Sequence, residues 1–344
     1  MSRLDPRLLC LASLALFVMA GLLFAANALV GGTPASAAGF EKRAVAPGVA
    51  RDGYLPTPTP VPLPSVARRC YEPRDESGGI TLRPAPATSV FRNCQVIAFY
   101  GLPGVPGLGV LGQYPDSPAL AAGLKAQAAA YDDVNGGRAV VGALHVIAAV
   151  AQAESGPDGD YLERIPGALI QQLIAFAEDH DFLVILDLQV GWSSVAEEVE
   201  AVLPYLANPR VHLALDPEWT MSGGYRPGQV IGSMDASQIN TAQAMLNDLV
   251  VANRLPTKML IIHQFTPGMI TNKREIADVA GVDLVIDIDG FGYAAAKVSE
   301  YEAFVEADAM EHGGMKLFYE QDIDLMSPAS VSALVPQPDV VIYQ

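Results

Sequence analysis

The sequence predicts an α/β fold, a TIM-like (β/α)8 barrel that ends on its eighth strand without a final helix. Eight short β-rich apolar runs alternate with longer helical segments between residues 89 and 344, and this span of 256 residues matches the usual size of such a barrel. The runs are almost continuously apolar, as strands of a parallel sheet covered on both faces must be. A doubly wound open sheet is the alternative.

Residues 1–31 are typical of an export segment. Arg3 and Arg7 precede an apolar run from Leu8 to Val30, and Ala35-Ser36-Ala37 follows as a small-residue cleavage candidate. The run of 23 residues fits both a cleaved signal peptide and an uncleaved membrane anchor. The chain is therefore expected to be exported, extracellular or at the cell surface, with the membrane as a partner if the segment stays uncleaved.

Residues 32–88 are rich in Pro, Gly and Ala and predict a linker. The stretch from Pro56 to Pro64 alternates proline with other residues and is typical of a stiff polyproline stalk. Beyond the stalk the remaining cysteines are Cys70 and Cys94. In an oxidising compartment this pair predicts a disulfide worth roughly 3 kcal/mol, with two buried free thiols as the alternative.

The barrel domain is predicted to span residues 89–344 and to consist of alternating strands and helices. Its predicted strands are Gln95–Tyr100, Ala139–Val146, Leu183–Leu188, Val211–Leu215, Met259–His263, Leu284–Ile288, Lys316–Tyr319 and Asp339–Tyr343. Its predicted helices are Pro118–Asp132, Tyr161–His180, Val195–Leu206, Ala236–Arg254, Lys273–Ala280 and Ala294–His312. Ser194 and Asp235 stand where helix caps are expected. The segment from Tyr71 to Pro86 is expected to pack beside strand eight, where the last helix is missing.

The charge and the motifs of the sequence argue against nucleic acids and nucleotides as partners. The chain has 38 acidic and 21 basic residues, a net charge of −17 that argues against nucleic acid. Residues 1–69 carry +4, so the remainder carries −21. Gly107–Gly112 matches the GxGxxG pattern of nucleotide-binding loops, but Pro115 and Pro118 fall where the following helix should begin. The Gly-rich loop 101–112 is therefore interpreted as a mobile loop over the barrel mouth, and no nucleotide or other cofactor is predicted.

Polar and acidic side chains gather where the predicted strands end, which is where barrel active sites form. Aromatic residues stand beside several of them, and aromatic faces next to carboxylates suit a sugar ring. Strand periodicity places Asp216 with Glu218, and Asp287 with Asp289, on one face. The candidate substrate-binding residues are Tyr100, His145, Asp187, Gln189, Asp216, Trp219, His263, Gln264, Asp287, Asp289, Tyr319 and Asp322.

Glycoside hydrolysis is the leading hypothesis, because it needs one protonated and one ionised carboxyl group on either side of the scissile bond. Glu218, after strand four, is the candidate acid, and Glu320, after strand seven, is the candidate nucleophile. This arrangement resembles retaining barrel glycosidases, whose acid/base and nucleophile lie at the ends of strands four and seven. The chain departs from that pattern because Pro217 precedes Glu218, where the family usually has Asn.

A second resemblance covers most of the barrel. The chain is similar to uncharacterised exported bacterial proteins, often labelled lipoproteins, with a TIM-barrel, glycoside-hydrolase-like domain. That resemblance implies the fold and the compartment and brings no activity with it. The shared stretches are Asp216–Trp219, Ile231–Ser233, His263–Phe265, Asp289–Gly292, Phe318–Asp322 and Tyr343–Gln344.

Two alternatives stay open beside glycan hydrolysis. One is a non-catalytic scaffold domain that binds a glycan or cell-wall polymer. The other is a metal-dependent hydrolase, in which His145, Asp187, Asp216, His263 and Asp289 would converge on a cation. No short-range ligand pair such as HxH or HExxH occurs, so no metal is predicted. The other histidines, His180, His212 and His312, are interpreted as helix-end or surface residues.

Overall fold

The computed structural model describes Cys70, residues 88–114 and residues 117–344. Within them eight parallel strands close into a barrel, because β1 pairs with both β2 and β11. The closed barrel confirms the predicted fold and excludes the open sheet. The export segment, the stalk and Tyr71–Pro86 lie outside the described residues. The barrel strands are β1 (Cys94–Gly101), β2 (Ala139–Ala151), β4 (Leu183–Gly191), β5 (Val211–Thr220), β7 (Lys258–Gln264), β9 (Val282–Ile288), β10 (His312–Leu317) and β11 (Val340–Tyr343).

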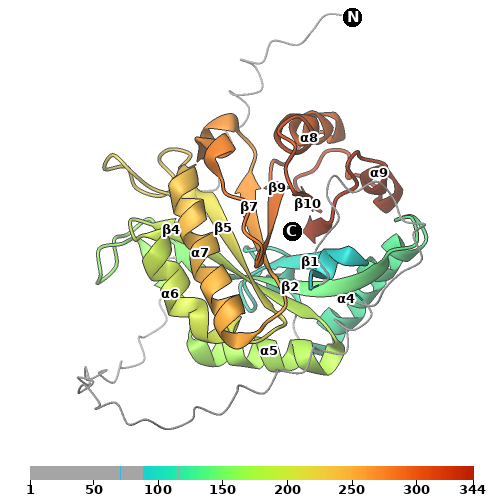
Figure 1. The fold of residues 1–344 in the computed structure, drawn as a ribbon, viewed down its shortest axis with the longest axis horizontal. Helices are drawn as coiled ribbons and strands as arrows, with labels where there is room; N and C mark the ends of the chain where they lie inside the picture. Colours follow the sequence, from blue (N-terminus) through green and yellow to red (C-terminus); the bar gives the residue numbers. More distant parts are fainter. Residues whose placement is uncertain (1–69, 71–87, 115–116) are drawn as a thin grey trace, which may run out of the picture. The chain divides into compact units, whose positions relative to one another are not determined.

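Helices surround this barrel, as Figure 1 shows for α4 to α7. Ser194 and Asp235 cap α6 and α7 through reciprocal hydrogen bonds with Glu197 and Gln238, as their positions in the sequence predict. No helix within the described residues is long and apolar enough to cross a membrane. The helices are α3 (Val110–Gln113), α4 (Ser117–Asp132), α5 (Gly167–His180), α6 (Val195–Leu206), α7 (Ala236–Asn253), α8 (Ala294–Tyr301) and α9 (Pro328–Ser332).

Short elements complete the chain. The strand β3 (Leu162–Arg164) pairs antiparallel with the end of β2, and β6 (Met234–Asp235) pairs with β8 (Ile270–Thr271) outside the barrel. The remaining short helical turns are η1 (Val90–Arg92), η2 (Pro267–Met269), η3 (Lys273–Glu275) and the π-helical η4 (Glu302–Glu306).

Two predicted helices are wrong in extent. The predicted helix Lys273–Ala280 is only the turn η3, because the Asn240 side chain bonds the backbone of Glu275 and Ala277 and holds that segment along α7. The predicted helix Tyr161–His180 begins at Gly167, because its first residues form β3 and Pro166 stands at the N-cap.

The seventh barrel strand also lies earlier than predicted. β10 starts at His312, inside the predicted helix Ala294–His312, and ends before Phe318. The helical path stops at Ala309, whose φ of 50° breaks it. The strand begins His-Gly-Gly, and Gly313 is required because an added Cβ would lie 2.1 Å from the Tyr301 hydroxyl. Glu320 therefore lies three residues beyond the strand end.

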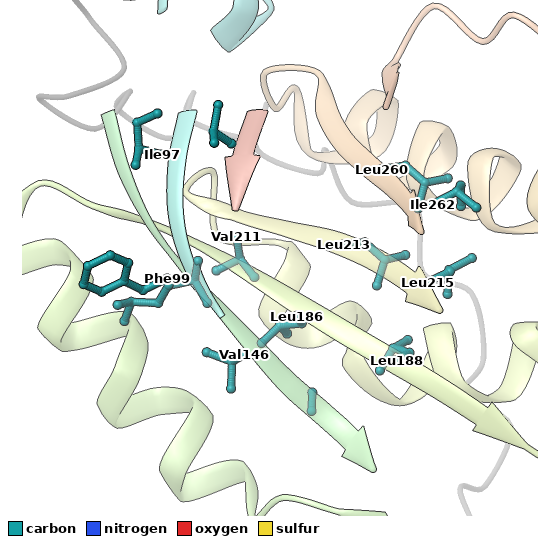
Figure 2. Packing of buried hydrophobic residues seen from close by; sticks show 14 of the residues in the cluster. Ile97, Phe99, Val146, Leu186, Leu188, Val211, Leu213, Leu215, Leu260 and Ile262 are labelled. Carbon is teal, nitrogen blue, oxygen red and sulfur yellow. The ribbon is translucent and has the colours of Figure 1, made fainter. Parts of the chain in front are cut away.

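Side chains alternate between the two faces of every barrel strand, as strand geometry requires. The outward set packs against the helices and includes Ile97, Leu186 and Leu213, as Figure 2 shows. The inward set fills the barrel in levels. Its middle level is apolar and consists of Ala98, Ala143, Ile185, Ala214, Ile261, Val285 and Ile342.

A disulfide joins Cys70 to the first residue of β1, at the N-terminal end of the barrel, as the sequence predicts. Cys70 is joined to Cys94, and both are fully buried. The Asn93 side chain also donates a hydrogen bond to the Cys70 carbonyl oxygen at 2.8 Å.

Candidate functional site

A layer of polar side chains crosses the barrel interior at the C-terminal ends of its strands. On every barrel strand except β11, the inward position just above the apolar middle level carries a polar residue. We call this set the upper layer. It consists of Tyr100, His145, Asp187, Asp216, His263, Asp287, Asp289 and Lys316, all buried.

His263 is the hub of the upper layer. Its Nδ1 lies 2.9 Å from Asp287 Oδ2 and its Nε2 lies 3.2 Å from Asp187 Oδ2. Burial alone would lower the pKa of His263, but Asp187, Asp289 and Asp287 together raise that pKa well above its usual value. The pKa of Asp187 is in turn held low, against its own desolvation, by His263 and His145. His263 is therefore an imidazolium between two carboxylates.

His145 differs from His263 in charge. Its Nε2 lies 3.3 Å from Asp187 Oδ2, yet burial is the largest effect and lowers the pKa of His145. His145 is neutral at pH 7 for that reason. Its Nδ1 and the Oδ1 atoms of Asp187 and Asp287 have no hydrogen-bond partner among the described residues.

Lys316 supplies the second positive charge of the layer. Its ammonium lies 2.9 Å from Asp289 Oδ1 and 3.6 Å from the centre of the Tyr100 ring. Burial would lower the pKa of Lys316, but Asp289 and Asp287 outweigh it and raise that pKa. Sequence reasoning missed Lys316, because a lysine at the start of a predicted strand gives no signal of burial.

Glu218 and Asp216 stand at the end of β5, above Lys316. Desolvation and then the charges of Asp216 and Asp289 raise the pKa of Glu218 well above its usual value, which favours the protonated form of its carboxyl group. Desolvation is also the main cause that raises the pKa of Asp216 to about 7. Glu218 is half-buried and Asp216 is buried. Glu218, with its raised pKa, thus lies next to the upper layer and interacts electrostatically with the ion-paired carboxylate of Asp289.

The Ile231–Ser233 stretch holds the Glu218 backbone in place. Gly232 N donates to the Glu218 carbonyl oxygen at 2.7 Å, and Ser233 N donates to the Thr220 oxygen at 3.2 Å. A Cβ at Gly232 would lie 2.5 to 2.6 Å from three carbonyl oxygens of β5, so only glycine fits. The loop after β5 is therefore clamped against the residue that carries the proton.

An Asp216→Asn variant is expected to move the pH dependence of any reaction that uses Glu218 as an acid. After desolvation, the charge of Asp216 is the largest cause of the raised pKa of Glu218, so removing that charge lowers the pKa. The alkaline limb of the rate profile should shift to lower pH, because Glu218 then loses its proton earlier. Asparagine keeps the oxygen that accepts from Glu218 N at 3.1 Å. An alkaline limb that stays in place in steady-state kinetics from pH 4 to 10 would contradict this assignment.

The remaining candidates from the sequence lie around the layer rather than in it. Gln189 Oε1 accepts from Ala151 N at 2.6 Å, and Gln264 Oε1 accepts from Lys273 at 2.9 Å. Asp322 accepts from Gly292 N and Phe318 N and pairs with Lys297, so it ties the loops after β9 and β10 together. These contacts are structural.

Glu320, Tyr319 and Trp219 lie nearer the surface. Glu320 is exposed in the turn after β10 and is not paired with the upper layer among the described residues. Tyr319 is exposed, stacks on Tyr343 and donates to Gln127 Oε1 at 2.8 Å. Trp219 is half-buried beside Glu218. The pairing of Glu218 with Glu320 therefore stays a prediction.

Exposed aromatic side chains surround the mouth of the barrel. Every aromatic residue that is exposed within the described residues lies in a loop that follows a barrel strand, and all are at least 42% exposed. They are Trp192 after β4, Tyr225 after β5, Phe291 and Tyr293 after β9, and Tyr319 after β10. Trp192 is fixed by a hydrogen bond from Nε1 to the Tyr225 carbonyl oxygen at 2.7 Å. It borders a hollow of about 240 Å³ that the loop 221–224 completes.

A larger hollow of about 310 Å³ lies elsewhere, between α4 and the end of α5. Lys125 and Phe182 line it, and none of the upper-layer residues does. The mouth itself is partly covered by the loop after β1, where Leu102 and Leu108 pack onto the inner cluster that contains Tyr100. Leu102 N donates to the Leu108 oxygen at 2.9 Å, so this loop folds back on itself.

A metal ion fits the upper layer less well than acid/base chemistry does. His145, Asp187 and His263 bring three ligand atoms within 4.8 Å, and so do His263, Asp287 and Asp289. Both ring nitrogens of His263 already face carboxylates, however, and the Lys316 ammonium neutralises Asp289. The layer thus contains its own cations.

Comparison with known proteins found similarity to solved structures alone. No protein-family model matches the chain, and no curated protein matches its sequence. Solved structures that resemble it include barrel glycoside hydrolases. Oxaloacetate acetylhydrolase with its product oxalate has a TM-score of 0.40 and 10% identity over 73% of this chain and 75% of that chain. The tri-modular GH5 endo-β-1,4-glucanase of Bacillus licheniformis with cellotetraose has a TM-score of 0.43 and 11% identity over 77% and 56%.

A Bacillus subtilis mannanase has a TM-score of 0.34 and 11% identity over 63% of this chain and 74% of that chain. At these scores the likeness carries no argument about activity. Any activity of this protein therefore depends on the side chains of the upper layer and of the barrel mouth.

Proposed function

We propose that this protein is a glycoside hydrolase of the cell envelope or extracellular space, with Glu218 as its general acid. One observation carries the proposal. A carboxyl group whose pKa is raised well above its usual value interacts electrostatically with an ion-paired carboxylate at the C-terminal end of a (β/α)8 barrel. Paired carboxyl groups whose surroundings separate their pKa values are what acid-assisted glycosidic cleavage requires.

The second carboxylate is more favourably assigned to Asp289 than to Glu320. Asp289 contributes to the rise in the pKa of Glu218, so the two side chains are close enough to interact. The ammonium of Lys316 pairs with Asp289 Oδ1 at 2.9 Å. Glu320 is exposed and has no such partner among the described residues. In this scheme Asp289 acts as nucleophile or as general base toward water.

A glycan is the favoured substrate class because of the aromatic residues around the mouth. Tyrosine and tryptophan faces present a large apolar area with a polar edge, which suits the faces of sugar rings. The Trp192 ring is held by its hydrogen bond to the Tyr225 carbonyl oxygen, so it loses little freedom when a sugar ring binds. Export is supported by the N-terminal sequence, and fractionation of cells that produce the full chain tests it.

The test is incubation of the purified protein with a panel of polysaccharides and peptidoglycan, with release of reducing sugars as the readout. Asp289→Asn is expected to lower the rate by at least about 100-fold, because it removes the ionised partner. Glu320→Gln is the matched carboxyl-to-amide control and is expected to stay within about threefold of wild type. The reverse result would assign the second carboxylate to Glu320.

A non-catalytic glycan-binding domain is the second candidate. It is favoured by the internal pairing of the upper layer, in which Asp187, Asp287 and Asp289 already contact His263 or Lys316. If no substrate is cleaved and glycans bind wild type and Asp289→Asn equally, this function replaces hydrolysis. Substitution of Trp192 by alanine would then weaken binding, because the aromatic face is the contact in either case.

A further inference from the structure

A second polar cluster lies at the opposite, N-terminal end of the barrel. It consists of Asp283 at the start of β9, Glu311 just before β10 and His312 at the start of β10, and we call it the lower cluster. Each residue offers one ligand atom, and these three atoms lie within 4.8 Å of one another. Asp283 precedes Asp287 by four positions on β9, which is about 13 Å along a strand. The lower cluster is therefore separate from the upper layer.

The lower cluster has spare coordinating capacity inside the protein. His312 is buried and its Nε2 has no hydrogen-bond partner among the described residues. The same is true of Asp283 Oδ1 in a fully buried side chain. Buried polar atoms are rarely left unpaired, because each lost hydrogen bond destabilises the folded state. Two such atoms on side chains whose ligand atoms lie within 4.8 Å of one another indicate a missing ligand.

The other atoms of the lower cluster are already fixed. His312 Nδ1 lies 2.7 Å from Asp339 Oδ2, and Asp339 Oδ1 pairs with Arg138 at 2.5 Å. This contact assigns Nδ1 to Asp339 and leaves Nε2 as the ring atom that would coordinate an ion. The Phe91 ring packs on the imidazole with centroids 4.5 Å apart. A histidine oriented by a carboxylate behind it is the usual arrangement of a metal ligand.

The two carboxylates are oriented in a similar way. Asp283 Oδ2 accepts from Thr257 Oγ1 at 2.7 Å, and Oδ1 has no such partner among the described residues. Glu311 Oε2 accepts from Leu284 N at 3.2 Å. Glu311 is half-buried, whereas Asp283 and His312 are buried, so it gives the cluster its access to solvent.

We propose that Asp283, Glu311 and His312 bind a divalent transition-metal ion, with Zn²⁺ as the best match. One imidazole and two carboxylates favour Zn²⁺ over Ca²⁺ or Mg²⁺, which prefer oxygen ligands alone. A water molecule on the Glu311 side would complete a tetrahedral site. The ion would join β9 to β10 and, through Asp339 and Arg138, to the strands on either side of β1. Its role is therefore structural, and it is independent of the proposed function.

The test measures Zn²⁺ binding by tag-free, full-length protein with isothermal titration calorimetry at pH 7. One ion per chain is expected, with a higher melting temperature in Zn²⁺ and no such rise in an equal concentration of Mg²⁺. Glu311→Gln and Asp283→Asn are each expected to weaken Zn²⁺ binding at least tenfold. Glu311→Gln alters a half-exposed side chain, so its fold, checked by circular dichroism, should be kept. Co²⁺ bound at the site should show visible absorption that Glu311→Gln removes.

Asp187→Asn is the matched control, because it makes the same change in the upper layer. It is expected to leave the affinity for Zn²⁺ unchanged. If Asp187→Asn abolishes Zn²⁺ binding and Glu311→Gln does not, the ion belongs to the upper layer and this proposal is wrong. Failure of the wild-type protein to bind Zn²⁺ at all would also overturn it.

Discussion

A Glu218→Gln variant is expected to lose about 10²- to 10⁴-fold in kcat on the substrate that the wild-type protein cleaves. Glutamine has the shape of a protonated glutamate, so it fits the half-buried position beside Asp216. It has no proton to give to the leaving group. KM should change little, because the aromatic residues around the mouth make the binding contacts.

The pH profile separates this loss of an acid from a loss of folding. Wild-type activity should persist at neutral pH and fall only as Glu218 ionises, since burial raises the pKa of that carboxyl group well above its usual value. The residual activity of Glu218→Gln should lack this alkaline limb. Glu200→Gln, an exposed change on α6, serves as the control and should match wild type. A Glu218→Gln enzyme with wild-type kcat would exclude Glu218 as the acid.

A Lys316→Met variant is expected to lower the free energy of unfolding by about 3 to 5 kcal/mol. Methionine keeps most of the volume and removes the charge, so Asp289 remains buried without its partner at 2.9 Å. The contact of the ammonium with the Tyr100 ring is lost as well. Urea unfolding followed by circular dichroism measures the change.

The double variant Lys316→Met/Asp289→Asn shows whether the charge imbalance is the cause. Removing both members of a buried pair costs less than removing one, so part of the lost stability should return. A single variant that loses less than about 1 kcal/mol would mean that water reaches Asp289 and replaces the ammonium.

The strand order and most of the upper layer could be predicted because both follow from local patterns. Where such runs alternate with helical segments, a continuous apolar run such as Leu183–Leu188 predicts a buried strand of a parallel sheet. The period of two then places His145, Asp187 and Asp287 inside the barrel at the same end. Caps such as Ser194 add local hydrogen bonds that the sequence alone specifies.

What escaped prediction depends on contacts between distant parts of the chain. β10 begins His312-Gly313-Gly314, which has no apolar run, and its glycines are needed only because Tyr301 and Asp287 lie against them. The shift of that strand hid Lys316 and left Glu320 in an exposed turn. His212 and His312 were assigned to the surface or to helix ends, but both are buried. The partner of a charged strand residue such as Lys316 lies on a distant part of the chain and can be identified only in the folded barrel.

The apolar middle level between the two polar ends gives the barrel a modular character. Ala98, Ala143 and Val285 offer no group through which a proton or hydrogen bond could pass from one end to the other. Among the described residues the lower cluster and the upper layer share no hydrogen-bond partner, so substitutions at the two ends should act additively. Selection could therefore replace the chemistry at the mouth while the base of the barrel stays unchanged, or strengthen the base without altering what the mouth recognises.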